Sequence, residues 1–248
     1  MRMFRYFAVS AAASLLSVAA LAAPGWTVTG LTVLPSDAPK VVAALDALFA
    51  SEVGKKAPGR VVLRANLADG DEPETHTVVS LAASAEEREA FQNELWASEA
   101  WTELTSSISS VNQEPGTTMR GMIVWNHGDR SDDDVIWRNH YFTVREPQAM
   151  MAAMQAYTQS PGGQAQPSQV HLSFVVAGGA GGPSHIVSVG YASEAEMEAS
   201  IVAQAQDPAW QALVRTLGAV AVYHGATLQR DLKAWGPASV EAVSDTGN

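Results

Sequence analysis

The 248-residue sequence contains no cysteine. This absence excludes disulfides, thiolate nucleophiles, cysteine-ligated metal sites and attachment to a membrane through a lipid-bearing cysteine. A protein without disulfides depends on its apolar core for stability. With 47% hydrophobic residues, a chain of this length can bury such a core.

Basic side chains are also few. Lys and Arg together number 15 against 26 Asp and Glu, which gives a formal net charge of −11. Removing a leader that contains Arg2 and Arg5 would bring the charge to −13. Such an excess of negative charge argues against nucleic acid and anionic lipid as partners.

Long apolar runs are absent except at the start of the chain. Residues 1–5 are basic, residues 6–21 are apolar and uncharged, and Ala20-Leu21-Ala22 has the small-x-small pattern that signal peptidases cleave. The pattern predicts a signal peptide over residues 1–22 and a soluble mature protein in the periplasm or the medium, without membrane attachment. An N-terminal membrane anchor is the alternative, but the run is short for a spanning helix.

The remaining sequence repeats itself at a shift of 109 residues. Ser84-Ala85-Glu86-Glu87 returns as Ser193-Glu194-Ala195-Glu196, and Ala100-Trp101 returns as Ala209-Trp210. This period is the size of a small domain and predicts a tandem duplication. We expect repeat one over residues 23–127, an acidic linker over 128–136, repeat two over 137–236 and a flexible tail over 237–248.

Each repeat shows the pattern strand, helix, strand, strand, helix, strand. Residues 26–34 alternate as a half-buried strand does, and Ser84 with Glu87 forms a capping box at the start of a later helix. Ser193 with Glu196 repeats this capping box in the second half. The element order predicts an α+β protein made of two tandem ferredoxin-like βαββαβ repeats.

This order, together with the small residue and Trp that begin the last helix of each half, resembles the dimeric α/β-barrel superfamily. That superfamily includes antibiotic-biosynthesis monooxygenases, haem-degrading monooxygenases and stress-responsive barrel proteins. Its members dimerise so that two four-stranded sheets close one barrel. The resemblance covers Trp26 to Gly236 and implies that both antiparallel sheets pack into one intrachain α/β barrel. A monomer would then be sufficient.

Strand alternation indicates which side chains face the interior of this barrel. In the second strand of repeat one, the apolar series of Val61, Leu63, Ala65 and Leu67 is expected to face the helices. The intervening polar positions would then face the barrel, as would matching positions in repeat two and the third-strand residues Ser80 and Ser188. The predicted ligand-binding residues are Arg64, Asn66, Trp137, Asn139, Tyr141 and His171.

Three functions are compatible with such an interior. The first is the binding of a small apolar or aromatic molecule, because a few convergent polar groups in an apolar enclosure typify a ligand site. The second follows from the resemblance: cofactor-independent monooxygenases of the superfamily use Asn, Trp and Arg to stabilise a substrate enolate. The third is a barrel that serves only protein contacts, with interior polar groups that satisfy one another.

No cofactor or metal is expected. Haem-degrading relatives carry the relevant His on the second helix, and residues 84–108 and 193–217 contain no His. The acidic stretch over residues 129–134 lacks the ligand spacing of a calcium loop. The glycine-rich stretch over residues 178–183 joins two strands without a Lys or a following helix, which indicates a hairpin rather than a phosphate loop.

Overall fold

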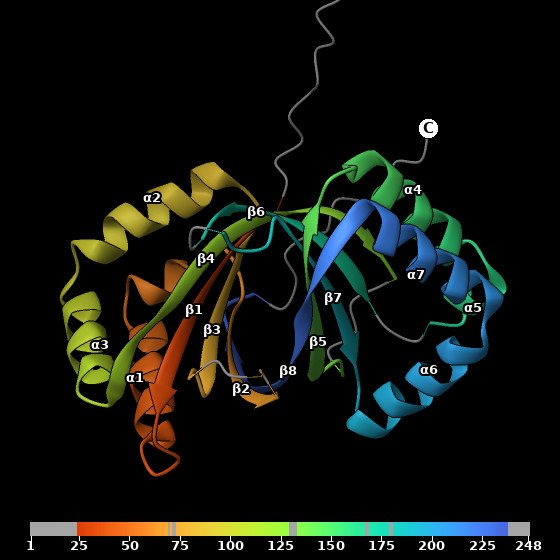
Figure 1. Ribbon diagram of the computed structural model, residues 1–248. Coiled ribbons are helices and arrows are strands. Elements are labelled where there is room, and N and C mark those ends of the chain that lie inside the picture. Colours follow the sequence, from red (N-terminus) through yellow and green to blue (C-terminus); the bar gives the residue numbers. More distant parts are fainter. Residues whose placement is uncertain are drawn as a thin grey trace, which may run out of the picture.

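The computed structural model in Figure 1 describes residues 24–68, 70, 73–128, 133–166, 169–178 and 181–237. The predicted signal peptide lies outside these residues, as do positions 238–248 of the predicted tail and part of the predicted linker. No helix in the described ranges is long and apolar enough to cross a membrane.

Both repeats contain the predicted order of strands and helices. Repeat one consists of β1 (Gly25–Val33), α1 (Ala38–Ala50), the short 3-10 helix η1 (Gly54–Lys56), β2 (Val61–Ala68), β3 (His76–Ala82), α2 (Ala85–Trp96), α3 (Glu99–Ser109) and β4 (Asn112–His127). Repeat two consists of β5 (Ile136–Val144), α4 (Pro147–Thr158), α5 (Pro161–Gln164), β6 (Val170–Ala177), β7 (His185–Tyr191), α6 (Glu194–Gln206), α7 (Pro208–Val220) and β8 (Ala221–Trp235).

The eight strands form one closed antiparallel ring in the order β1-β3-β2-β8-β5-β7-β6-β4. Figure 1 shows this ring at the centre, with the helices of repeat one on one side and those of repeat two on the other. The predicted α+β fold with an intrachain barrel is therefore confirmed. The helices cover the outer face of the ring, and the inner face encloses the barrel interior.

The long last strand of each repeat joins the two halves. β4 pairs with β1 of its own repeat and with β6 of the other, while β8 pairs with β5 and with β2. Trp125 at the end of β4 consequently packs into the core of repeat two. Trp235 at the end of β8 packs into repeat one, where it stacks on Phe49 at 5.6 Å between ring centroids.

Side-chain caps explain where the outer helices begin. The Ser84 Oγ accepts the backbone N–H of Glu87 at 3.1 Å, and the Ser193 Oγ accepts that of Glu196 at 3.1 Å, as predicted. The Asp207 carboxylate accepts the N–H of Ala209 at 2.8 Å at the start of α7. Each cap satisfies one of the backbone donors that a helix start leaves unpaired.

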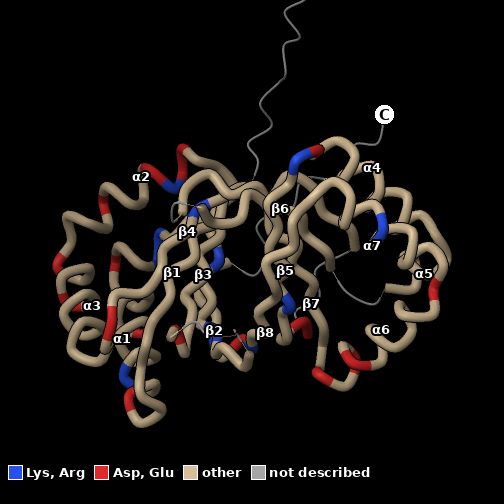
Figure 2. The backbone as a smooth tube through the Cα atoms, viewed as in Figure 1, with Lys and Arg blue, Asp and Glu red and all other residues tan. Residues whose placement is uncertain are grey.

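Each repeat has its own apolar core between the helices and the outer face of the ring. Val41 and Leu45 of α1 are buried in repeat one, and Met150 and Met154 of α4 take the equivalent places in repeat two. Acidic side chains lie on the outer helices, mainly α2, α3 and α6, and Figure 2 shows no continuous basic stripe along the described chain.

Candidate functional site

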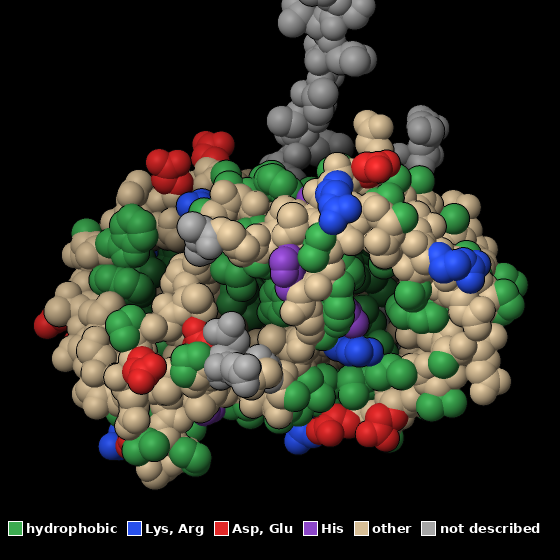
Figure 3. All heavy atoms as spheres, viewed as in Figure 1, with side chains coloured by type: hydrophobic (Ala, Val, Ile, Leu, Met, Phe, Trp, Pro, Cys, Tyr) green, Lys and Arg blue, Asp and Glu red, His purple; other side chains and the backbone are tan. Residues whose placement is uncertain are grey.

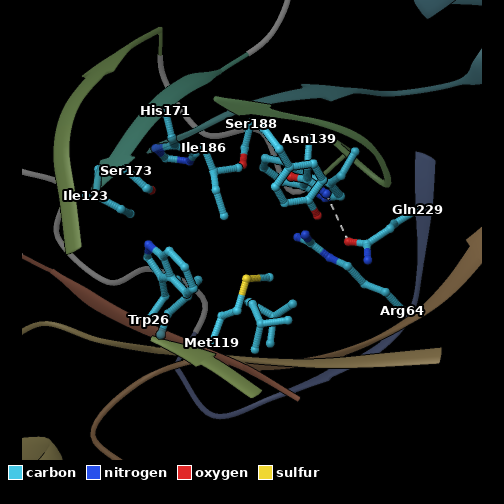
Figure 4. Close-up of a pocket in the computed structure, with 15 residues that line it drawn as sticks. Trp26, Arg64, Met119, Ile123, Asn139, His171, Ser173, Ile186, Ser188 and Gln229 are labelled. Atoms are coloured by element: carbon cyan, nitrogen blue, oxygen red, sulfur yellow. Dashed lines mark hydrogen bonds between the residues drawn. The ribbon is translucent and has the colours of Figure 1, made fainter. Parts of the chain in front are cut away.

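The barrel interior contains a small cavity of about 90 Å³, which we call the barrel cavity. Five of the six predicted ligand-binding residues line it, and Figure 4 shows several of them converging. These five are Arg64, Trp137, Asn139, Tyr141 and His171. Their common orientation follows from the two-residue period of the strands. Their role in ligand binding stays a prediction.

The sixth residue, Asn66, is not among the residues that line the cavity and belongs to an amide network beside it. The Asn139 Nδ2 donates to the Gln229 Oε1 at 3.1 Å, the bond drawn in Figure 4. The Gln229 Nε2 then donates to the Asn66 Oδ1 at 3.0 Å and to the Thr77 Oγ1 at 3.1 Å. These groups satisfy one another, so this side of the interior is bonded without a ligand.

Arg64 has one end bonded and the other directed inward. Its Nε donates to the Asp231 Oδ1 at 2.7 Å, and both side chains are about nine-tenths buried. The guanidinium lies 4.6 Å from the centroid of the Trp137 ring, which stacks on His171 at 6.1 Å. Burial lowers the pKa of Arg64 and the Asp231 carboxylate opposes that shift. The guanidinium remains charged at neutral pH.

The expectation that Ser80 faces the barrel is wrong. On β3 the cavity is lined by Val79 and Leu81, and Val79 pairs with Val28, another lining residue. Ser80 alternates with them and therefore lies on the helix side. The error is a register error of one residue, because the counterpart of Ser80 at a shift of 109 is Val189 rather than Ser188. Ser188 itself lines the cavity as expected.

A second and larger cavity lies in repeat two, between its helices and the outer face of the ring. This helix-side cavity has a volume of about 500 Å³. In Figure 3 the half of the molecule that holds these helices is hollowed, with hydrophobic side chains in the recess and a histidine and a basic side chain near its edge. Its floor consists of Arg138, His140, Phe142, Val187, Val189 and Tyr223, and its roof of Met154, Tyr157, Trp210, Leu213 and Leu217.

His140 is the histidine in the floor of the helix-side cavity. It alternates on β5 with the inward-facing Asn139 and Tyr141, so it projects toward the helices. Its Nδ1 lies 3.3 Å from the Tyr223 hydroxyl. Burial, and then the positive charge of Arg138, lower the pKa of His140 to about 4. The imidazole is therefore neutral at physiological pH, and the same shift makes it a weaker base than an ordinary histidine.

A group of neutral polar side chains occupies another part of the wall. The Gln204 Nε2 donates to the Gln166 Oε1 at 2.8 Å and to the Ser200 Oγ at 3.4 Å. Tyr191 is buried, and burial raises its pKa; Tyr157 also has a raised pKa, chiefly because of burial. These groups can exchange hydrogen bonds with a ligand without bringing a charge into the cavity.

The sequence interpretation missed the helix-side cavity, although the repeat contains a signal for it. Positions 49, 91 and 95 in repeat one are Phe, Phe and Leu, and all three pack into its core. At a shift of 109, the matching positions are Thr158, Ser200 and Gln204. Each replacement is smaller or more polar than its counterpart, so the equivalent space in repeat two is not filled in the same way.

Neither a scan against models of protein families nor a search of curated proteins finds a match to this chain. Solved structures do match. A candidate monooxygenase from Lactobacillus acidophilus NCFM superposes with a TM-score of 0.60 and 9% identity, covering 86% of this chain and 96% of the other. An anthrone oxidase-like protein has a TM-score of 0.57 and 16% identity, covering 90% and 96% of the two chains.

The chain has the fold of the dimeric α/β-barrel proteins, with both halves of the barrel in one chain. A heme-binding protein from Thermus thermophilus also matches, with a TM-score of 0.51 and 9% identity over 86% of this chain and 92% of that protein. Identities this low establish the shared fold and leave the activity to be argued from the residues of the site.

Proposed function

We propose that the chain is an exported protein that binds a small, mostly apolar, ring-containing molecule in the helix-side cavity. The observation that carries this proposal is the volume of about 500 Å³ under the helices of repeat two. Binding pockets for small molecules span roughly 300–1,000 Å³. The barrel cavity, where the sequence interpretation placed the ligand, offers about 90 Å³.

The chemistry of the walls supports a ring-containing ligand. Tyr157 and Trp210 meet edge to face at 5.3 Å, and Phe142 and Tyr223 lie 5.2 Å apart, so aromatic surfaces are present in both roof and floor. Aromatic pairs of this kind favour a further ring packed between or beside them. The neutral polar groups would bind a hydroxyl or carbonyl substituent of such a ring.

Ligand binding is tested with 1-naphthol as the probe and calorimetry as the measurement. We expect saturable binding to the wild type, and at least a tenfold loss of affinity in Thr158→Phe, because the added ring occupies the cavity. Asn139→Ser, on the barrel side, is the matched control and is expected to bind as the wild type does. A loss in Asn139→Ser but not in Thr158→Phe would place the ligand in the barrel. Absence of binding would favour a barrel used only for protein contacts.

Export is tested by N-terminal sequencing of the protein recovered from the periplasm or the medium. The apolar leader and its Ala20-Leu21-Ala22 pattern support a mature chain that begins at Ala23. An intact Met1 on a cytoplasmic protein would contradict the proposal.

A second candidate function, cofactor-independent oxidation, is favoured by the placement of His140 and Arg138 side by side in the floor of the helix-side cavity. His140 would accept a proton from an acidic C–H or O–H of the bound ring, and Arg138 would stabilise the resulting anion. With anthrone as the substrate, reaction with dioxygen gives anthraquinone and water. Oxygen consumption above the buffer rate, lost about 100-fold in His140→Gln and retained in His185→Gln, would support this function. A rate equal to the buffer rate would contradict it.

The residues present do not fit a haem. The helices over the helix-side cavity, α4 to α7, carry no His within their described spans. His140 projects from the floor with its Nδ1 toward Tyr223. Arg138 is the one cation among the described residues that line the cavity, whereas a haem brings two propionates. The proposed ligand is therefore the apolar molecule itself.

A further inference from the structure

The barrel cavity contains hydrogen-bond donors without acceptors. The indole nitrogens of Trp26 and Trp137 are fully buried, the two residues being 5% and 3% exposed, and neither nitrogen has a hydrogen-bond partner in the part of the chain that the structure describes. A buried N–H without a partner is destabilising, because the group has lost its hydrogen bonds to water and gained none in return. Two such groups around one cavity therefore call for an acceptor in that cavity.

The position of the Trp26 indole is well fixed. A side chain at Gly121 would meet the Trp26 ring at 2.3 Å, so glycine is what permits the indole to lie against β4. In Figure 4 the indole nitrogen of Trp26 is turned toward Ile123 and Ser173, which also line the cavity. Trp137 takes the equivalent place in the first strand of repeat two.

Arg64 adds a third donor. Its Nε is bonded to Asp231, and Figure 4 shows the far end of the guanidinium directed into the cavity. The planar edge of a guanidinium matches two oxygens of a planar anion. The hydroxyls of Ser173 and Ser188 lie in the same wall and can donate further bonds.

We propose that the barrel cavity binds a small planar oxyanion, of the size of nitrate or formate. Such an anion only accepts hydrogen bonds, which matches the excess of donors, and it is small enough for about 90 Å³. Asp231 balances part of the charge of Arg64, so millimolar affinity is expected. This site is separate from the helix-side cavity and does not depend on the ligand proposed there.

The first experiment observes the indole N–H groups directly. The exported protein is labelled with ¹⁵N in its tryptophans, and sodium nitrate is added while the N–H resonances are recorded by NMR. Sodium hexafluorophosphate, a weaker acceptor, serves as the ionic-strength control. The resonances of Trp26 and Trp137 are expected to shift saturably with nitrate, and those of Trp101 and Trp210 to stay in place. No saturable shift at Trp26 or Trp137 would mean that water alone fills the cavity and would overturn the proposal.

The second experiment removes one donor at a time. Trp26→Phe and Trp137→Phe keep an aromatic ring but lose the N–H, and each is expected to lower the nitrate affinity about tenfold. Trp210→Phe, in the roof of the helix-side cavity, is the matched control and should bind nitrate as the wild type does. Unchanged affinity in both barrel variants, with native circular dichroism, would overturn the proposal even if nitrate binds elsewhere.

Discussion

The two repeats have the same fold but fill it differently. In repeat one, Phe49, Phe91 and Leu95 pack into the core between the helices and the ring. The cavity of this repeat, about 540 Å³, lies instead between α1 and α3. In repeat two the same space contains a cavity of about 500 Å³. Ala82 of repeat one corresponds to Tyr191 of repeat two, so a larger side chain is present beside the cavity as well as smaller ones. The two repeats therefore differ in how side-chain volume is distributed within the same order of strands and long helices.

The two repeats differ in what their cores do: the core of repeat one is packed at these positions, and the core of repeat two leaves open space. A cavity lowers stability, because atoms around it lose packing contacts. Repeat one packs Phe49, Phe91 and Leu95 into the space that is open in repeat two, and this packing stabilises a ring that both repeats share. Repeat two can then keep an open volume at no loss of the overall fold. Substitutions in the two repeats test this difference.

The largest effect is expected when the matched residues at positions 49 and 158 are exchanged. Phe49→Thr removes a ring that stacks on Trp235 at 5.6 Å and should lower the free energy of unfolding by about 3–4 kcal/mol. Thr158→Phe adds a ring where there is space, so stability should be equal to or above that of the wild type. Urea denaturation measures both. A cost below about 1 kcal/mol for Phe49→Thr would mean that repeat one is not the better packed half.

A smaller effect is expected from His140, which has no titratable counterpart in repeat one. Its pKa of about 4 in the folded protein lies below the ordinary value of 6.5. Between these values the unfolded chain binds the proton more tightly than the folded protein does. The contribution of His140 to the free energy of unfolding is therefore fully present above pH 6.5 and is lost as the pH falls toward 4. The loss should reach about 3 kcal/mol.

Unfolding at a series of pH values measures this effect. In His140→Gln, the free energy of unfolding should fall less between pH 6.5 and 4 than in the wild type, by the amount that His140 contributes. The remaining slope comes in part from His76 and His185, which occupy matched positions and both have pKa values lowered by burial. An identical pH profile in the variant and the wild type would refute the assignment of a depressed pKa to His140.

The smallest effect is expected at the helix caps, where the repeats are alike. Ser84→Ala and Ser193→Ala each remove a bond of 3.1 Å to a backbone N–H, and each should cost about 1 kcal/mol. Equal costs, measured by thermal denaturation, would show that the repeats differ in packing and not in how their helices begin. A difference above about 1 kcal/mol between the two variants would argue against that conclusion.

Much of the fold could be predicted because its signals are local. The capping boxes at Ser84 and Ser193 and the alternation around Arg64 each depend on a few neighbouring residues. The same alternation brought five of six predicted residues to one cavity. It also turned His140 toward the helices, although that residue was not recognised as part of a site.

The remaining features could not be predicted because they depend on residues far apart in the chain. The size of the helix-side cavity is set by the summed volumes of side chains from several helices and strands. The placement of Trp125 and Trp235 in the opposite repeat depends on pairing between strands of different repeats. Neither property appears in a window of neighbouring residues.

The closure of the ring within one chain has a consequence for how such a protein can change. In an assembly of two identical subunits, every substitution occurs twice, so a hollowed core would weaken both halves together. Once the halves are covalently joined, a substitution such as the one that separates Phe49 from Thr158 is made in one half alone. The loss of stability then arises in one half only, and the packing of the other half is unchanged.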